Sequence, residues 1–421
     1  MHNSSTAPAM STSMRLIALL LVPLLLLPLL LGRPADAGSA AAASAAASRV
    51  FLPLALDRAT FRASPLGSGF SQVTEITDAG DDRLFIAERA GIVKILHPDG
   101  RITTFLDIRQ RVISNDGSEY GFFDIAFHPG YKDPTSPGYG FFYVSYTTGK
   151  DDGVIIDVHF NVSRFRVSAD PDVADPNSEV LLQHEKQSFN VHKGGGMEFD
   201  PRDDMLYVGM GDDRLLLIAQ SDRSPKGKIS RLPVDNVPRD ATPRSLATIS
   251  EEIWVFGLRN PWRFDLDPAT NSIFIGEVGD YLWEEVNLAP MTARGYNFGW
   301  PCMEGGFVFP ETNEVPQCQT PWLFKRAIYE YPHNDGSGRC AVIGGHVNRP
   351  VYNPTDGRYI FGDMCSREIY SLSRNAAGAW QRTLLGVVPG DLINTIGEDR
   401  HGTQYVGTAA RGGPIWKLFI P

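Results

Sequence analysis

The sequence has few cysteines, no excess of positive charge and, beyond its first residues, almost no helical periodicity. Only four cysteines occur among 421 residues, and none stands in the C-x-x-C spacing that zinc sites commonly use. The formal net charge is −10, so the chain lacks the basic surface that nucleic acid or an anionic membrane would require. Because apolar residues seldom recur at intervals of three and four, a predominantly helical fold is excluded.

Several catalytic sequence motifs are also missing. The chain contains no nucleophile elbow, Walker loop, zincin helix or dinucleotide-binding fingerprint. Gly194-Gly195-Gly196 is a glycine run, but no helical pattern follows it, so we do not expect it to cradle a phosphate. Any chemistry must therefore come from residues outside these motifs.

Residues 1–37 have the pattern of a secretory signal peptide. Arg15 precedes an apolar run, Leu16 to Leu31, and Ala35-Asp36-Ala37 offers a small-x-small cleavage pattern. Two prolines interrupt the run, which is short for a bilayer core, so we favour secretion over a retained membrane anchor. Residues 38–58 are expected to be an Ala/Ser-rich linker. The mature protein is predicted to be secreted or periplasmic, without a membrane span.

All four cysteines, Cys302, Cys318, Cys340 and Cys365, lie in the C-terminal half. In an exported chain, an even number grouped in this way indicates two disulfides. Three pairings are possible, and we favour the sequential one, Cys302–Cys318 with Cys340–Cys365. A zinc site is the alternative interpretation.

The rest of the sequence repeats one local pattern, in which a turn, an apolar strand ending in a small residue, a polar gap and a second strand follow one another. The six copies begin at Asp81, Gly138, Asp203, Thr270, Asp356 and His401. One four-stranded blade cannot bury both of its apolar faces alone, so it must stack on neighbours. We therefore predict an all-β fold, a six-bladed β-propeller with four-stranded antiparallel blades, over residues 59–421.

Two alternatives remain for this part of the chain. A β-sandwich would also be rich in short strands, but it would not need six versions of one strand pair. The segment RVFLPLAL, Arg49 to Leu56, is compatible either with an edge strand or with the linker.

His192 is the histidine most suggestive of chemistry. It stands in FNVHKGGGMEFDP, directly before three glycines that lead into a strand, and glycines let backbone and ligand approach closely. An imidazole beside such an opening suits a general base near neutral pH, whereas the plainer interpretation is a structural histidine. His97 and His128 are expected in turns, and His346 is a further candidate lining residue.

Arg259 and Asn260, in GLRNPWRFDLDP, form a second candidate pair. A guanidinium binds carboxylates or a quinone oxygen in a bidentate manner, and an asparagine can donate and accept beside it. The alternative is a buried arginine that satisfies loop carbonyls. The next polar stretch, GEVGDYLWEE (276–285), offers carboxylates and carbonyls that suit calcium, although a solvated acidic loop would have the same composition.

Three segments between residues 257 and 305, GLRNPWRFDLDP, GEVGDYLWEEVN and GYNFGWPCMEG, resemble the signature of the glucose/sorbosone dehydrogenase family. RLFIAERAGIVKIL, IAFHPGY, IGGHVNRP and YIFGDMCSREIY match as well, in the family's order. That family comprises soluble quinoprotein sugar dehydrogenases, aldose dehydrogenases and propellers like the hedgehog-interacting protein. The resemblance implies a six-bladed propeller, in agreement with the repeat count.

The resemblance also implies two cofactors, pyrroloquinoline quinone (PQQ) over the centre of one face, and calcium clamped between the quinone and two backbone carbonyls. His192 corresponds to the catalytic base, Arg259 and Asn260 to the pair that contacts the quinone, and Gly279 and Asp280 to the calcium ligands. The implied reaction is oxidation of an aldose: His192 removes a hydroxyl proton, hydride passes to the quinone, and an external electron acceptor reoxidises it.

Later loops differ from the family pattern. Soluble glucose dehydrogenases supply a lysine and two close arginines to the quinone there, whereas GDMCSREIY has no lysine and DLINTIGEDRHG has no arginine pair. Arg367 and Arg411 are the residues that could take their place, and Glu119 stands near the position of a glutamine. The alternative function is a non-catalytic propeller that binds a protein or glycan, and a propeller lactonase or hydrolase is the third hypothesis.

Overall fold

A computed structural model of the chain describes residues 60–238, 252–309, 314–333, 335–349 and 357–421. The expected signal peptide, the linker and the segment RVFLPLAL lie outside these residues. Every described residue belongs to one compact unit, Leu56–Pro421. Within the described ranges, no helix has the length and apolar character that crossing a membrane demands.

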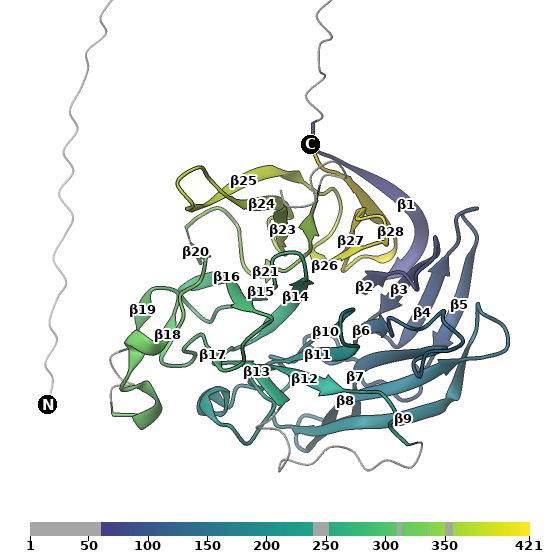
Figure 1. Cartoon of the computed structure of the whole chain (residues 1–421), viewed down its shortest axis with the longest axis horizontal. Helices are drawn as coiled ribbons and strands as arrows, with labels where there is room; N and C mark the ends of the chain where they lie inside the picture. Colours follow the sequence, from purple (N-terminus) through teal and green to yellow (C-terminus); the bar gives the residue numbers. More distant parts are fainter. Residues whose placement is uncertain (1–59, 239–251, 310–313, 334, 350–356) are drawn as a thin grey trace, which may run out of the picture. The chain divides into compact units, whose positions relative to one another are not determined.

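The described residues form six small antiparallel sheets arranged in a ring, which confirms the predicted six-bladed β-propeller (Figure 1). The first blade consists of β2 (Val73–Thr77), β3 (Leu84–Glu88), β4 (Ile92–Leu96) and β5 (Ile102–Asp107). The second consists of β6 (Phe122–Phe127), β7 (Phe141–Asp151), β8 (Ile156–Val167) and β9 (Ala174–Gln187). The third consists of β10 (Gly194–Asp200), β11 (Met205–Met210), β12 (Lys228–Pro233) and β13 (Ile253–Phe256).

The fourth blade consists of β14 (Pro261–Asp267), β15 (Ser272–Glu277), β16 (Trp283–Pro290) and β20 (Tyr329–Pro332). The fifth consists of β21 (Val342–Ile343), β23 (Arg358–Asp363), β24 (Glu368–Arg374) and β25 (Trp380–Val387). The sixth consists of β26 (Ile393–Glu398), β27 (Gln404–Thr408), β28 (Arg411–Phe419) and β1 (Arg62–Ser71). Short additions are β17 (Tyr296–Asn297) beside β13, β22 (Val347–Asn348) beside β23, the hairpin of β18 (Met303–Glu304) and β19 (Phe307–Val308), and the 3₁₀-helices η1 (Leu216–Gln220), η3 (Pro316–Cys318) and η4 (Pro321–Leu323).

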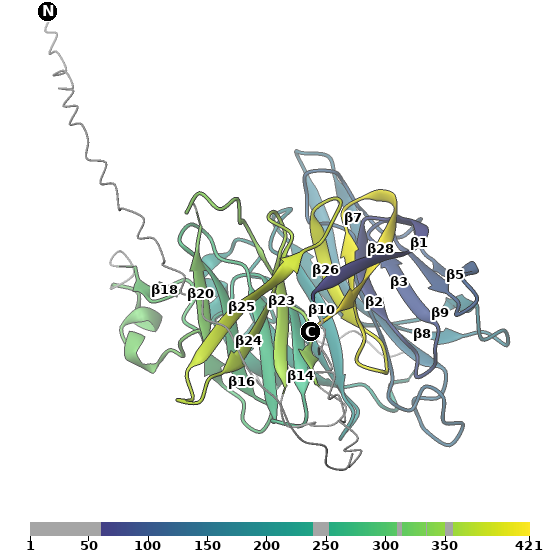
Figure 2. The ribbon, with the colours of Figure 1, turned by 90° about the horizontal axis from the view of Figure 1, so that it is seen from above.

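The ring is closed by the two ends of the described chain. Strand β1 pairs antiparallel with β28, from Arg62 opposite Phe419 to Ser71 opposite Arg411, and the two strands lie side by side in Figures 1 and 2. The inner strand β26 of this last blade packs against β2 of the first. The six sequence repeats supply the second and third strands of the blades, wholly or in part; the copy that begins at Asp81, for example, contains β3 and β4.

Clusters of buried apolar side chains fill the interfaces between neighbouring blades. Between the first two blades, the ring centroids of Phe105 and Phe142 lie 5.0 Å apart, and Phe85 packs edge-on against Phe105. Burial of such aromatic side chains is what makes each blade depend on its neighbours.

Neighbouring strands within a blade are antiparallel, so loops alternate between the two faces of the ring. We call the upper face the one formed by the loops that precede the inner strands β2, β6, β10, β14, β21 and β26. The loops between the second and third strands of each blade open on this face too. The lower face contains the loops that follow the inner strands. Ligand-binding residues on a propeller are expected on such loops.

The two disulfides are Cys302–Cys318 and Cys340–Cys365, with Cα–Cα distances of 5.3 Å and 5.6 Å, which confirms the sequential pairing. The zinc interpretation is wrong, because all four thiols are consumed. The first disulfide lies within the long insertion between β16 and β20, and the second ties the segment before β21 to the β23–β24 turn.

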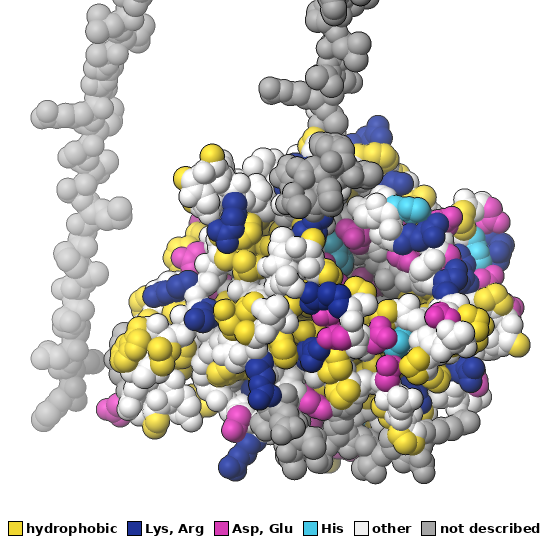
Figure 3. Space-filling model, viewed as in Figure 1, with side chains coloured by type: hydrophobic (Ala, Val, Ile, Leu, Met, Phe, Trp, Pro, Cys, Tyr) yellow, Lys and Arg dark blue, Asp and Glu magenta, His cyan; other side chains and the backbone are white. Residues whose placement is uncertain are grey.

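Acidic, basic and apolar side chains are interspersed on the face of the molecule that Figure 3 shows. Lysine and arginine do not form a continuous surface among the described residues there, which agrees with the acidic net charge of the chain. This face therefore lacks the basic footprint typical of nucleic-acid-binding proteins.

Candidate functional site

The residues predicted for catalysis, cofactor binding and metal binding lie in loops or strand ends of the upper face, whereas His346 follows the inner strand β21 on the lower face. His192 precedes β10, Arg259 and Asn260 precede β14, Gly279 and Asp280 lie between β15 and β16, Arg367 lies in the β23–β24 turn, and Arg411 begins β28. Contacts bring the first five together with two further residues, Asp212 and Trp300.

The central contact is between His192 and Asp212. The Nδ1 atom of His192 lies 2.7 Å from Oδ1 of Asp212, and both residues are buried. As a carboxylate, Asp212 can only accept a hydrogen bond, so Nδ1 carries the hydrogen and Nε2 carries the lone pair. No hydrogen bond to Nε2 is found within the described part of the chain. The arrangement therefore leaves one basic nitrogen ready to accept a proton.

The backbone around His192 is held in an uncommon conformation. His192 has φ of 58°, in the left-handed region that non-glycine residues seldom adopt. Its carbonyl oxygen lies so close to Gly211 that a Cβ there would stand 2.1 Å from it. Likewise, a Cβ on Gly195 would stand 2.5 Å from Phe123. Glycine is needed at both positions because β10 and the loop after β11 approach their neighbours so closely.

Trp300 connects Asp212 with the arginine of the site. Its Nε1–H donates to Oδ2 of Asp212 over 2.8 Å, and the guanidinium of Arg259 lies over its ring at 5.7 Å from the centroid. The backbone N–H of Asp212 in turn donates to the carbonyl of Arg259 over 2.7 Å. Histidine, aspartate, tryptophan and arginine thus form one connected buried network.

Arg259 is directed toward the loop after β15. Its Nη2 donates to Oδ1 of Asp280 over 2.7 Å and its Nη1 to the carbonyl of Val278 over 3.1 Å. The third donor, Nε, is buried and has no hydrogen-bond partner among the described residues. The positive charge is therefore largely compensated by Asp280, while one N–H group remains unsatisfied.

Asn260 joins β14 to β10. Its Oδ1 accepts the N–H of Gly194 over 2.9 Å, and its Nδ2 lies 3.4 Å from Oε2 of Glu119. The same Glu119 oxygen accepts the N–H of Lys193 over 2.9 Å. Glu119, noted in the sequence as a departure from the family pattern, therefore supports the loop that carries His192.

A carboxylate organises the loop that contains Gly279 and Asp280. Oε1 of Glu304 accepts the backbone N–H groups of four consecutive residues, Asp280, Tyr281, Leu282 and Trp283, over 2.7 to 3.1 Å. Because the N–H groups point inward to Glu304, the carbonyls of Gly279 and Asp280 are left without hydrogen-bond donors in the described structure. Two free carbonyls of this kind are oxygen ligands suited to calcium.

Other acidic groups of this stretch are structural. Glu277 accepts the N–H groups of Arg259 and Asn260 through Oε1, and burial raises the pKa of this carboxyl well above its ordinary value. Glu285 is buried as well, and burial raises its pKa to about 7. Neither is a solvated loop residue, so that interpretation of the acidic stretch is wrong for these two residues.

Arg367 and Arg411 stand apart from the network. Nη1 of Arg367 donates to the carbonyl of Gly390 over 2.6 Å. Arg411 forms an ion pair of 2.8 Å with Asp116, and both side chains are mostly exposed. Neither guanidinium forms a hydrogen bond or ion pair with His192, Asp212, Trp300 or Arg259 in the described part of the chain.

Lys193, next to His192, belongs to a buried ionic cluster. Its Nζ lies 2.5 Å from Oδ1 of Asp213, and Lys226 binds the other oxygen of that carboxylate at 2.8 Å. Burial lowers the pKa of Lys193, and the charge of Asp213 opposes this shift. Through Asp213, this ionic cluster anchors the loop that also contains Asp212.

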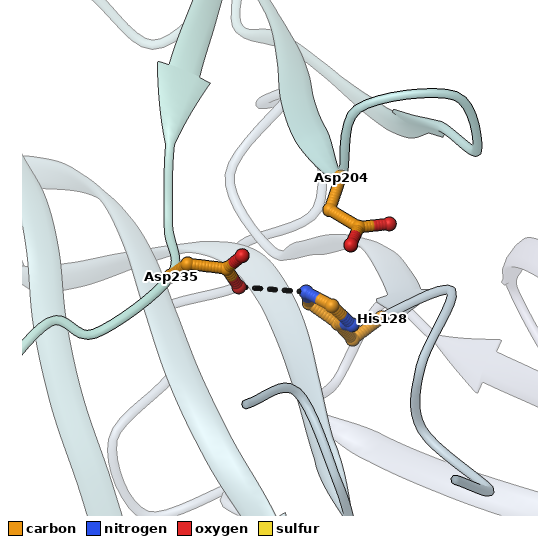
Figure 4. Close-up of side chains that lie close together, drawn as sticks. All are labelled: His128, Asp204 and Asp235. Atoms are coloured by element: carbon orange, nitrogen blue, oxygen red, sulfur yellow. Dashed lines mark hydrogen bonds and ion pairs between the residues drawn. The ribbon is translucent and has the colours of Figure 1, made fainter. Parts of the chain in front are cut away.

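His128 is placed as expected in a turn, but it also meets two acidic residues (Figure 4). His128, Asp204 and Asp235 are the one group in the described chain that brings three potential metal-ligand atoms of acidic, histidine or cysteine side chains within 4.8 Å. Nδ1 of His128 accepts the N–H of Gly130, so Nε2 carries the hydrogen that it donates to Asp235. In that tautomer Nε2 has no lone pair directed toward the carboxylates with which it could bind a metal ion. The contact between His128 and Asp235 is therefore a structural hydrogen bond.

Sequence reasoning missed Asp212 and Trp300. Asp212 follows β11 and Trp300 lies in the segment GYNFGWPCMEG, and the contact between their side chains joins loops 88 residues apart in the sequence. A polar residue directly after an apolar strand, on the same face as His192, was the available signal for Asp212.

Comparison with known proteins identifies the family of the chain. The model of the family described as Glucose / Sorbosone dehydrogenase matches residues 70–417. The hedgehog-interacting protein of Mus musculus is 33% identical over 399 residues, which cover 84% of this chain and 52% of that protein. An aldose sugar dehydrogenase of Escherichia coli is 27% identical over 278 residues, covering 66% of this chain and 72% of its own length.

Among solved structures, the PQQ-bound form of an aldose sugar dehydrogenase from Streptomyces coelicolor superposes with a TM-score of 0.65 at 17% identity. The match covers 86% of this chain and 99% of that one, and it supports the fold. The chain spans only 30% and 52% of the length of the first curated relatives that it matches, so their complete activities are not transferred to it.

Proposed function

Because the chain belongs to the glucose/sorbosone dehydrogenase family, we propose that it oxidises aldose sugars, with PQQ and calcium as cofactors. The observation that carries this proposal is the contact between His192 and Asp212, which leaves Nε2 of a buried histidine free to accept a proton. That contact lies on the upper face of a propeller, within a network that includes Arg259.

His192 is assigned the role of general base. Nε2 takes the proton of the sugar hydroxyl, and the imidazolium that forms is stabilised by the adjacent carboxylate of Asp212. Trp300 donates to the second oxygen of Asp212 and so fixes the carboxylate in the plane in which it meets His192. Asp212 and Trp300 are therefore positioning residues in this proposal.

Some of the residues around His192 are suited to hold the two cofactors. The free carbonyls of Gly279 and Asp280 would hold calcium, and the unsatisfied Nε of Arg259, together with Asn260, would face the quinone. When bound, PQQ supplies an electrophilic carbonyl carbon that takes up hydride. Arg367 and Arg411 are assigned to the carboxylates of the cofactor, for which the side chain of Arg411 would have to leave Asp116.

The proposal includes export and an external electron acceptor. Two disulfides fit an oxidising compartment, and residues 1–37 carry the features of a cleaved signal peptide. A small-molecule sugar is the expected substrate, and a soluble dye can replace the natural acceptor in an assay.

The test is reconstitution of the mature protein with PQQ and calcium, followed by dye reduction with a panel of aldoses. We expect activity that requires both cofactors and that His192→Ala reduces by about 100-fold or more. His401→Ala, which alters an exposed histidine on the lower face, is the matched control and should keep full activity. Absence of both quinone binding and dye reduction would refute the dehydrogenase proposal.

A second function is favoured by a different observation. The charge of Arg259 is compensated by Asp280 and that of Arg411 by Asp116, so the upper face offers few free cations for an anionic quinone. Upper-face loops also expose apolar side chains, among them Val154 (90% exposed) and Tyr281 (72% exposed). These features suit a non-catalytic propeller that binds a protein or glycan through this face. Lack of PQQ binding, together with a folded native protein, would favour this candidate.

A further inference from the structure

A second cavity, remote from His192, opens on the lower face. It has a volume of about 710 Å³ and is lined by the lower parts of the inner strands and the loops that follow them. This volume falls within the range of roughly 300–1,000 Å³ that is usual for small-molecule sites. Arg263 of β14 lies at its upper end, where it contacts β2, β6 and β26 across the centre of the ring.

The lining of this lower cavity is rich in carboxyl groups. Eight of the lining residues are Asp or Glu, three are Arg and one is His. Each basic group already has an acidic partner: Arg263 pairs with Glu75 and Asp124, Arg349 with Asp267, His346 with Asp265, and Arg400 with Asp82 outside the cavity. The cavity therefore contains more carboxyl groups than basic groups.

Glu198 of β10 and Glu398 of β26 are two lining carboxyl groups that form no ion pair with a basic side chain of the described chain. Oε2 of Glu198 accepts the N–H of Leu266 over 2.7 Å, and Oε2 of Glu398 accepts Nε2 of Gln404 over 3.2 Å. Neither Oε1 atom has a hydrogen-bond donor in the described structure. Burial raises the pKa of Glu198 well above its ordinary value and that of Glu398 to about 7, and the nearby charge of His346 offsets this effect only in part.

The hydrogen bond of His346 goes to Asp265 and not to either glutamate. Its Nδ1 lies 2.9 Å from Oδ1 of Asp265, and Asp265 also accepts the N–H of Val347 over 3.0 Å. Burial alone would lower the pKa of His346, but the hydrogen bond and charge of Asp265, with Glu398 and Glu198, raise it to about 10. The imidazolium is thus paired directly with Asp265, and neither glutamate receives a hydrogen bond from it.

The geometry favours an organic cation over a coordinated metal ion. No three acidic or histidine ligand atoms of this cavity come within 4.8 Å of one another, whereas a metal ion would need such convergence. The walls between the carboxyls are apolar and include Ile76, Phe264 and Ile396. Alternating carboxylates and hydrocarbon suit an ammonium group carried on a short methylene chain.

We propose that the lower cavity binds a small alkylamine, with its ammonium groups on Glu198 and Glu398 and its methylene chain on the apolar walls. Each ammonium donates hydrogen bonds to a carboxylate oxygen that has no donor from the protein. The lower cavity is built from the same inner strands as the upper-face site but shares no residue with it. A test of amine binding is therefore independent of a test of the dehydrogenase proposal.

The test is calorimetric and thermal titration of the mature protein with 1,4-diaminobutane. The neutral analogue 1,4-butanediol controls for the hydrocarbon chain, and calcium chloride controls for metal binding. Glu198→Gln and Glu398→Gln remove the proposed partners without loss of volume, and they should fold because they eliminate buried charge. Glu314→Gln, at an exposed position outside the cavity, is the matched control.

We expect the diamine to bind and to raise the melting temperature, and either cavity variant to weaken binding at least tenfold. Butanediol should not bind, and Glu314→Gln should behave as the native protein. Equal diamine binding in the native protein and in the double variant would overturn the proposal, as would the absence of any binding. Calcium binding that depends on Glu198 and Glu398, without diamine binding, would also overturn it in favour of a metal site.

Discussion

Asp212 holds the imidazole of His192 through a hydrogen bond of 2.7 Å between Oδ1 and Nδ1. The contact joins the loop before β10 to the loop after β11, and Trp300 of the insertion between β16 and β20 completes it from the next blade. Three separate segments of the chain therefore define the orientation and tautomer of one histidine.

Asp212→Asn tests whether this contact positions the base. The amide can donate to Nδ1 and so stabilise the tautomer that has its hydrogen on Nε2, which cannot accept a proton. We expect kcat for dye reduction to fall about 100-fold or more, with a much smaller change in KM. Trp300→Phe, which removes one donor to Asp212, should shift the pH profile of kcat and lower kcat less than Asp212→Asn does. Unchanged kcat and pH profile in Asp212→Asn would contradict the positioning role.

Arg263→Met tests the centre of the ring. Arg263 forms ion pairs with Glu75 and Asp124 and donates to carbonyls of Thr74 and Phe123, so its loss leaves two buried carboxylates uncompensated. The free energy of unfolding should decrease by about 3–5 kcal/mol.

Arg400→Met is the control for this substitution. Its partner Asp82 is 59% exposed, so loss of this surface ion pair should lower the free energy of unfolding far less than loss of Arg263 does. Both effects can be measured by urea denaturation. Equal effects of the two substitutions would show that Arg263 is not a central support.

The fold was largely predictable because the blades repeat. Second and third strands such as β3 and β4 carry clear apolar patterns between turn residues, and stacking of blades then requires a ring. Strand β1, RASPLGSGFS, was not predictable as the closing strand, since it pairs with β28 through its backbone and has no distinctive apolar alternation.

The site was predictable only in part. His192, Arg259 and Asn260 stand in motifs whose glycines and turns place them at strand starts, but side-chain partners such as Asp212 depend on how distant loops meet. The carboxyl-rich lower cavity likewise arises from six inner strands, and single residues such as Glu198 and Glu398 carry no local signal in the sequence.

The disulfides provide a third prediction. The unfolded, unreduced protein should show no reactive thiol, and reduction should release four thiols per chain. Replacing Cys340 and Cys365 together by serine should lower the free energy of unfolding by about 3 kcal/mol, because the closed loop restricts the unfolded chain. A thiol signal before reduction would contradict the pairing.

Glu398 gives a prediction for pH dependence. Burial raises its pKa to about 7 from an ordinary value near 4.5, while His346 lowers it and Asp265 raises it. Between these two values the folded state binds more protons than the unfolded state, so ionisation of Glu398 destabilises the fold as pH rises. Its contribution should reduce stability by at most about 1.4 kcal/mol per pH unit over that window.

Glu398→Gln should therefore flatten the fall in stability between about pH 4.5 and pH 7. Denaturation midpoints of both proteins, measured across this range in the absence of amines, give the comparison. A parallel pH dependence in the native protein and in the variant would contradict the assignment.

The most direct measurement of the central claim is a single-turnover experiment on the mature protein loaded with PQQ and calcium. Glucose or another aldose is added without an electron acceptor, and reduction of the bound quinone is followed by absorbance. The account predicts that the native protein reduces one equivalent of quinone, whereas His192→Ala binds PQQ with similar affinity and reduces it about 100-fold or more slowly. Quinone that stays oxidised with every aldose, or that fails to bind at all, would contradict it.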